Sequence, residues 1–192
     1  MAVNQAAIDH LRLDEAFDIE TYKPFNDCWT VKMDRELMVV DDDIEKVSRF
    51  SDDEAELQRA LLVINENYRQ IVLLSIDNKL IKEHEGGIAD SALFDEEQFR
   101  FIEFKTNAYG NSEQAVRDTF DKATDQLKET IHVFKDRLQK VNILFEDAVT
   151  LSCHIVISHR FPKSRAVKQE YQIRFADDND NIPLSFAEKT YW

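Results

Sequence analysis

The residues best suited to chemistry lie in the short stretch 101–105, which reads FIEFK. Glu103 and Lys105 are two positions apart, so in a β-strand they project from one face while their apolar neighbours project from the other. Asp90 lies on the preceding apolar segment, and antiparallel pairing of the two segments would bring its carboxylate near Glu103. Two such carboxylates form a pocket for a hard divalent cation, Mg²⁺ or Mn²⁺.

A cation between Asp90 and Glu103 would polarise a phosphodiester oxygen and lower the pKa of its bound water. The Lys105 ammonium would orient that water and offset charge in the transition state. Without the metal, repulsion between the carboxylates should raise the pKa of at least one of them, with Lys105 opposing the shift. The alternative is that Glu103 and Lys105 form a simple charge pair on a half-exposed strand.

The elements that must position these residues are readable from apolar patterning. Two runs, Ile88–Phe94 and Phe99–Lys105, flank the acidic turn at 95–98 and predict a hairpin. Apolar side chains at steps of three or four then predict a long helix over Ser112–Lys140, which should cover the sheet. Later strands are expected at Val149–Ser158, Tyr171–Phe175 and Leu184–Phe186.

The spacing of Asp90, Glu103 and Lys105 resembles the signature of the PD-(D/E)XK nuclease superfamily, which has the restriction-endonuclease-like fold. The glutamate follows the aspartate by thirteen residues, and the Glu-x-Lys lies late in an apolar strand. A long helix and another apolar strand follow, as they often do in that family. The resemblance covers about 52–175 and implies an α/β fold with a central mixed sheet flanked by helices.

By the same resemblance Asp90 and Glu103 are metal ligands and Lys105 is the catalytic lysine. Gln126, on the long helix, is an accessory residue that points toward the scissile phosphate. The residue before Asp90 is Ala89, where the family pattern has Pro. The superfamily also includes proteins without activity, so a catalytically silent protein-interaction module remains the alternative function.

The first fifty residues are expected to form a small α+β extension of a nuclease-like core at 51–192. The extension should hold a helix near 4–17 and a hairpin made from Cys28–Met33 and Glu36–Val40. Ser51 and Glu54 form a capping box, and the apolar spacing through Tyr68 predicts that a helix follows. The run Ile71–Leu74 either continues that helix or begins a buried strand. The acidic run at 41–43 is expected to be a solvated turn.

Composition excludes several classes of protein. Three glycines, at 86, 87 and 110, cannot build a phosphate-binding loop or a dinucleotide-binding turn. Cys28 and Cys153 are too few and too far apart for a thiolate zinc site or a disulfide framework, and both should be reduced and buried. No window approaches the apolar length of a membrane span, and the N-terminus lacks the pattern of a signal peptide. A cytoplasmic protein outside the membrane is expected.

The net charge of −14, from 24 Lys and Arg against 38 Asp and Glu, normally repels nucleic acid. The stretch 159–174 nevertheless carries five cations and one anion. If it is not a chance cluster, it should line the entrance to the cleft and contact phosphates, with DNA favoured over RNA. The expected contacts are Arg160, Lys163, Arg165 and Lys168. The overall acidity also fits a protein partner.

Overall fold

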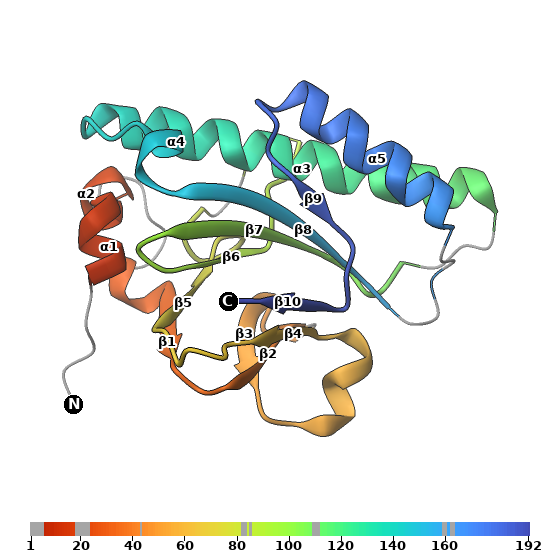
Figure 1. The fold of residues 1–192 in the computed structure, drawn as a ribbon, viewed down its shortest axis with the longest axis horizontal. Coiled ribbons are helices and arrows are strands. Elements are labelled where there is room, and N and C mark those ends of the chain that lie inside the picture. The colour runs from red at the N-terminus through yellow and green to blue at the C-terminus, as the bar shows by residue number, and fades with distance from the viewer. Residues whose placement is uncertain are drawn as a thin grey trace.

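A six-stranded mixed sheet forms the middle layer of the computed structural model, which describes residues 6–17, 24–42, 44–81, 84, 86–108, 112–158, 161 and 164–192 (Figure 1). In spatial order its strands are β1 (Trp29–Lys32), β5 (Ile71–Ser75), β6 (Ser91–Phe94), β7 (Gln98–Lys105), β8 (Thr150–Ile157) and β9 (Leu184–Ser185). The first four strands pair antiparallel with one another, whereas β8 runs parallel to β7 and β9 runs parallel to β8. The α/β class with a mixed central sheet flanked by helices is therefore confirmed.

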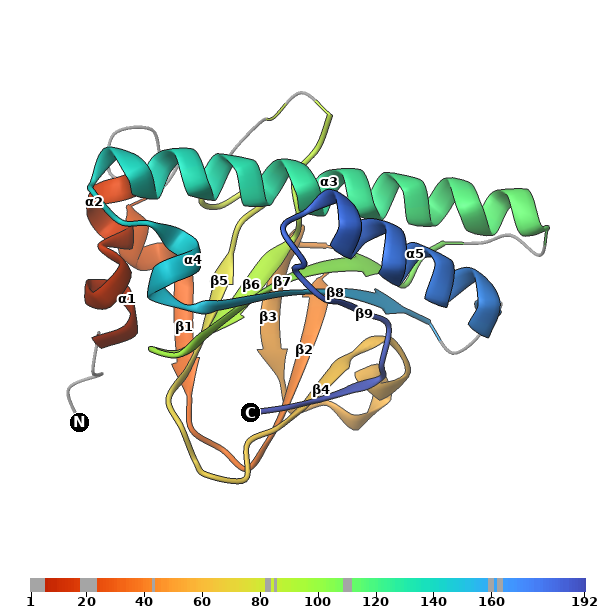
Figure 2. The same ribbon diagram turned by 45° about the horizontal axis from the view of Figure 1, so that its top comes forward.

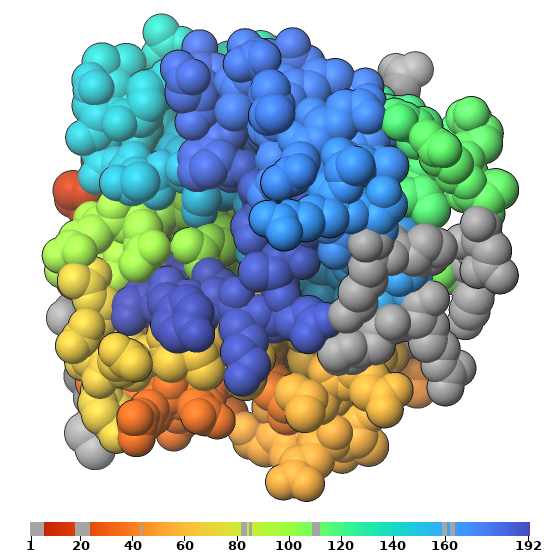
Figure 3. Space-filling view, turned by 45° about the vertical axis from the view of Figure 1, so that its right-hand side comes forward, coloured from red at the N-terminus to blue at the C-terminus, as the bar shows by residue number. Residues whose placement is uncertain are grey.

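A four-stranded sheet covers one face of the central sheet. Its order is β10 (Lys189–Tyr191), β4 (Leu61–Ile64), β2 (Glu36–Asp42) and β3 (Val47–Ser51). Leu37 and Val39 of β2 meet Ile102 and Phe104 of β7 in one buried apolar cluster. The space-filling view in Figure 3 shows the dark blue C-terminal segment crossing from the helical layer to this second sheet.

Helices cover the other face of the central sheet (Figure 2). They are α1 (Ala6–Leu11), α2 (Leu13–Phe17), α3 (Glu113–Lys140), α4 (Phe145–Ala148) and α5 (Arg165–Asp178), with short 3₁₀ turns η1 (Phe25–Asp27) and η2 (Glu54–Arg59) elsewhere. The Phe134 ring of α3 lies 5.0 Å from the Phe101 ring of β7, centroid to centroid. Among the described residues, no helix is both long and apolar enough to span a membrane.

The hairpin, long helix and central strand expected around the chemistry-bearing residues are all present. β6 and β7 pair antiparallel, and the turn between them is held by Asp95, whose Oδ1 accepts hydrogen bonds from the backbone N–H groups of Glu97 and Gln98. α3 begins after Ser112, whose hydroxyl accepts a hydrogen bond from the Ala115 N–H at 3.1 Å. Sequence patterning was sufficient to predict these elements, because the spacing of apolar residues within each segment matches the helix or strand that it forms.

The hairpin expected from Cys28–Met33 and Glu36–Val40 is wrong, because its two strands lie in different sheets. β1 pairs with β5 in the central sheet, while β2 pairs with β3 and β4 in the second sheet. The apolar side chains explain the separation, since Trp29 packs toward the helical layer and Val39 between the sheets. The segment expected as an N-terminal extension therefore contributes strands to both sheets. Its helix is divided into α1 and α2 at Arg12, whose φ is 49°.

The helix expected from residue 52 onward ends after η2, and Leu61–Ile64 form strand β4 instead. Leu61 and Val63 alternate into the core between the sheets, whereas Tyr68, which completed the helical spacing, is 56% exposed. The N-cap is Asp53, whose side chain accepts from the Ala55 N–H. The ambiguous run at 71–74 is strand β5, buried throughout.

The strand expected at Tyr171–Phe175 is also wrong, because these residues lie within helix α5. Tyr171 and Phe175 are four residues apart and share the buried face of that helix. The Tyr171 hydroxyl lies 2.8 Å from Asp121 Oδ1 on α3, which fixes the two helices together. Leu184 and Ser185 do form a short strand, β9, at the edge of the central sheet.

Candidate active site

The structure brings together the four residues singled out for chemistry, at the end of β7 beneath α3. Lys105 Nζ donates hydrogen bonds to Glu103 Oε1 and, at 2.8 Å, to Gln126 Oε1. Asp90 lies immediately before β6, and its Oδ2 accepts a hydrogen bond of 2.6 Å from the Phe104 backbone N–H. Two carboxylates, an ammonium and an amide therefore form one connected cluster.

The segment that carries Asp90 is held from two sides. Its carbonyl oxygen accepts the backbone N–H groups of Ile76 at 2.9 Å and Asp77 at 3.3 Å, just beyond β5. The preceding Ala89 N–H donates to Thr130 Oγ1 of α3 at 2.7 Å. The carboxylate of Asp90 is thus placed by the backbone of the central sheet and by the long helix at once.

Gln126 is fixed at both ends of its amide. Its Nε2 donates to the Ile88 carbonyl at 3.1 Å, which turns Oε1 toward Lys105. Gly87 makes this possible, because a Cβ there would lie 3.1 Å from Gln126 Nε2. Gly87 also has a φ of +85°, in the region that favours glycine.

We expect Gly87→Ala to impair the site, with Gly86→Ala as its control. Gly86 has a similar φ of +91° but no atom within 4 Å of a Cβ added there. Both variants should lose about 1–2 kcal/mol of unfolding free energy in urea, because both put Ala into a left-handed conformation. Only Gly87→Ala should also displace Gln126, which in a crystal structure would break its contact with Lys105. The same Gln126 position in both variants would contradict this reading.

Burial dominates the electrostatics of the two carboxylates. The Glu103 side chain is only 1% exposed, and desolvation raises the pKa of Glu103 to about 7 although Lys105 opposes the shift. Burial first, and then the charge of Glu103, raises the pKa of Asp90 well above its ordinary value. The upward direction expected from the sequence is confirmed, but removal from water is a larger cause than repulsion between the carboxylates.

The donor set fits a hard divalent cation. Glu103 Oε2 is buried and has no hydrogen-bond partner in the described part of the chain, an arrangement that costs free energy unless something satisfies that oxygen. Carboxylate oxygens are the ligands that Mg²⁺ prefers. Among the described residues, no three His, Cys, Asp or Glu side chains form a metal-binding group. A cation held by Asp90 and Glu103 would therefore keep several water ligands.

The sequence analysis missed Asp41, which it placed in a solvated turn. Asp41 is partly buried near the end of β2, and its charge raises the pKa of both Asp90 and Glu103. The alternation of Leu37, Val39 and Asp41 could have placed this carboxylate on the inward face of a strand.

The expected phosphate contacts are only partly described. Arg160 and Lys163 lie outside the described residues. Arg165 is exposed in the first turn of α5, and Lys168 is partly buried with its ammonium 5.7 Å from the centroid of the Phe186 ring. In Figure 1 α5 begins on the side of the molecule where β8 ends, which is the same end as Glu103 and Lys105 of the parallel strand β7.

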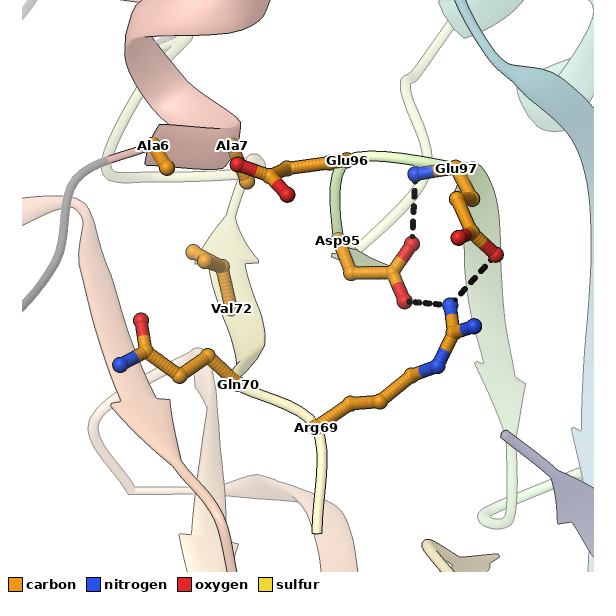
Figure 4. A pocket seen from close by; sticks show the side chains of 8 residues that line it. All are labelled: Ala6, Ala7, Arg69, Gln70, Val72, Asp95, Glu96 and Glu97. Carbon is orange, nitrogen blue, oxygen red and sulfur yellow. Dashed lines mark hydrogen bonds and ion pairs between the residues drawn. The ribbon is translucent and has the colours of Figure 1, made fainter. Parts of the chain in front are cut away.

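A cavity of about 340 Å³ is lined by none of the four residues of this cluster, and Figure 4 shows the side chains that line it. It lies between α1 and the turn that precedes β7, so it is at the opposite end of β7 from Glu103. Arg69 Nη1 closes one side by donating to Asp95 Oδ2 at 2.9 Å and to Glu97 Oε2 at 2.6 Å. These charged groups satisfy one another and make no contact with the candidate site.

The candidate site thus combines metal-type oxygen ligands with a positioned ammonium. This is a set that can stabilise negative charge on a phosphoryl oxygen and activate water. Comparison of the chain with protein-family models, curated proteins and solved structures found no match.

Proposed function

We propose that this protein is a metal-dependent nuclease that hydrolyses phosphodiester bonds in nucleic acid, with DNA favoured over RNA. The observation that carries the proposal is the cluster of Asp90, Glu103, Lys105 and Gln126, in which one buried carboxylate oxygen lacks a partner among the described residues. The order of hairpin, long helix and parallel strand around the cluster supports a restriction-endonuclease-like core.

In this proposal Asp90 and Glu103 hold Mg²⁺ or Mn²⁺, which supplies Lewis-acid activation of a phosphoryl oxygen and of water. The Phe104 N–H fixes the direction of the Asp90 carboxylate. Lys105 donates a hydrogen bond to the phosphate oxygen on which negative charge develops. The Ile88 carbonyl holds the Gln126 amide, and Gln126 Oε1 accepts a hydrogen bond from Lys105 that keeps the ammonium next to Glu103.

Substrate approach has to overcome the net charge of −14. In the proposal, Arg165 and Lys168 at the start of α5, together with Arg160 and Lys163, neutralise backbone phosphates near the site. Cys28 and Cys153 are buried thiols that form no disulfide in the described part of the chain, which supports a reducing, cytoplasmic location. The alternative function is that of a catalytically silent module, which binds a protein partner on the same scaffold; the acidic net charge favours this alternative.

Lys105→Met is the test of the proposed activity, with Lys122→Met as the control. Lys122 is exposed on α3, so the two variants lose the same charge. With Mn²⁺ and fluorescently labelled single- and double-stranded DNA and RNA, we expect cleavage by the parent and by Lys122→Met. Cleavage by Lys105→Met should fall at least ~100-fold, because one charge-stabilising donor is lost.

Two results of the cleavage assay would contradict the nuclease proposal. One is a parent protein that cleaves none of the four substrates when Mn²⁺ is present. The other is cleavage by Lys105→Met at the rate of the parent. Either result would favour the silent interaction module.

A further inference from the structure

One side of α3 holds the segment that precedes β6. Glu129 and Thr130 lie three and four residues after Gln126, so the three side chains project from the same side of the helix. Glu129 Oε1 is 2.7 Å from His84 Nε2, and Gln126 Nε2 donates to the Ile88 carbonyl at 3.1 Å. Thr130 makes the third contact with this segment, and of the three α3 residues it is the one that is fully buried.

The Thr130 hydroxyl joins the two halves of the candidate site. Its Oγ1 accepts a 2.7 Å hydrogen bond from the backbone N–H of Ala89, the residue before Asp90. The same hydroxyl donates to the Gln126 carbonyl at 2.7 Å, and the Gln126 side chain accepts from Lys105. One side chain therefore contacts both the neighbour of a proposed metal ligand and the residue that holds the Lys105 ammonium.

Solvent water does not reach this contact, because Thr130 and Ala89 are each 0% exposed. If the hydroxyl were lost, the Ala89 N–H would be a buried donor without an acceptor, which costs free energy and favours a shift of the segment. The next residue is Asp90, so such a shift displaces the carboxylate that accepts the Phe104 N–H at 2.6 Å. The position of a proposed metal ligand thus depends on a hydroxyl of α3.

We propose that Thr130 is a positioning residue of the candidate cation site, which acts by fixing Asp90 relative to Gln126 and not by contacting metal or substrate. This inference rests on the proposed function. A hard cation held by two carboxylates needs both of them in the correct place, and groups that orient metal ligands change metal affinity without touching the metal. The Thr130 hydroxyl thereby increases the affinity of the site for Mg²⁺ or Mn²⁺.

Calorimetric titration with Mn²⁺ tests this role, with Thr130→Val and Thr124→Val as the matched pair. Both threonines are buried on α3 and donate to the carbonyl four residues earlier, but the Thr130 hydroxyl also holds Ala89. Val keeps the shape of the side chain and removes the hydroxyl, so we expect Thr130→Val to weaken Mn²⁺ binding about 10-fold. Thr124→Val should bind like the parent. Thr130→Ser, which keeps the hydroxyl and loses a methyl group, should recover most of the affinity.

Hydrogen exchange of the Ala89 amide, measured by NMR without metal, tests the contact itself. The amide should be protected in the parent, in Thr124→Val and in Thr130→Ser, and it should exchange faster in Thr130→Val. Unchanged exchange in Thr130→Val would overturn the positioning role. Circular dichroism checks folding, and Thr130→Ala replaces Thr130→Val in the comparison with Thr130→Ser if the Val variant does not fold.

The outcomes of the titration separate this inference from the proposed function. If Glu103→Gln abolishes Mn²⁺ binding while Thr130→Val binds like the parent, the role of Thr130 is overturned and the metal site stands. Equal weakening by Thr130→Val and Thr130→Ser would also overturn it, because packing of the methyl group would then explain the effect. Equal weakening by Thr124→Val would overturn it as well, because the contact with Ala89 would then not matter. A parent that binds no Mn²⁺ overturns both proposals.

Discussion

Glu103→Gln is expected to stabilise the protein at and above pH 7 while removing its cation site. The pKa of Glu103 is about 7 in the folded protein, against an ordinary value of 4.5. Between these values the folded state keeps a proton that the unfolded state releases, so stability from this carboxyl is present below pH 4.5 and lost as pH rises through 7. At about 1.4 kcal/mol per pH unit, the penalty at neutral pH is about 3 kcal/mol, and Gln avoids it.

Urea unfolding without divalent cations, at pH 5, 6, 7 and 8, measures this difference. The stability of Glu103→Gln relative to the parent should rise by about 2.5 kcal/mol between pH 5 and pH 8. Glu66→Gln is the control, because Glu66 is exposed and its variant should follow the parent at every pH. Mn²⁺ should narrow the gap by stabilising only the parent. A difference independent of pH would show that Glu103 is not a buried, proton-binding carboxyl.

Trp192→Ala should be the most destabilising of the single substitutions considered, at about 3–5 kcal/mol. The Trp192 side chain is buried in the core between the sheets, and its indole Nε1 donates to Asp95 Oδ2 at 2.8 Å. The Arg100 guanidinium lies over the ring, 5.0 Å from the centroid. The substitution therefore opens a cavity and removes a donor from a buried carboxylate.

Tyr191→Ala is the matched control for Trp192→Ala. Tyr191 is adjacent on the same end of the chain but is 67% exposed, so its loss should cost less than about 1 kcal/mol in urea unfolding. Equal costs would mean that the C-terminal segment does not anchor the second sheet. Because Trp192 contacts the turn at the start of β7 and the site lies at its end, folded Trp192→Ala should bind Mn²⁺ like the parent.

The elements that could be predicted are those whose own residues carry the pattern of a helix, strand or turn. The β6–β7 hairpin and α3 each carry a complete apolar period and a turn or cap, and β8 carries a β-branched run, so the relation of Asp90, Glu103 and Lys105 followed from the sequence. The family resemblance implied only that Gln126 is an accessory residue that points toward the scissile phosphate. Its side-chain contact with Lys105 was not predicted, because that contact depends on the packing of α3 against β7.

The rest of the fold depends on partners distant in sequence. β1 and β2 are neighbours along the chain, yet they separate because their apolar side chains enter cores on opposite faces of the central sheet. Leu61 fits the apolar spacing of a helix and that of a strand equally well. It lies in a strand because β4 pairs with β2 in the second sheet. Asp41 was missed because its acidic neighbours suggested a turn, although its alternation with Leu37 and Val39 is that of a strand.

The pairing of β10 with β4 has a consequence for the order of folding. Lys189 is opposite Leu62, so the edge of the second sheet closes only with a segment made more than about a hundred residues later. Until β10 is synthesised, β4 on the ribosome has an unpaired backbone edge, and Leu61 and Val63 lack part of their final packing. Such an edge is a template for pairing with other chains. A pause in synthesis between β4 and β10 should therefore favour aggregation of nascent chains over completion of the sheet.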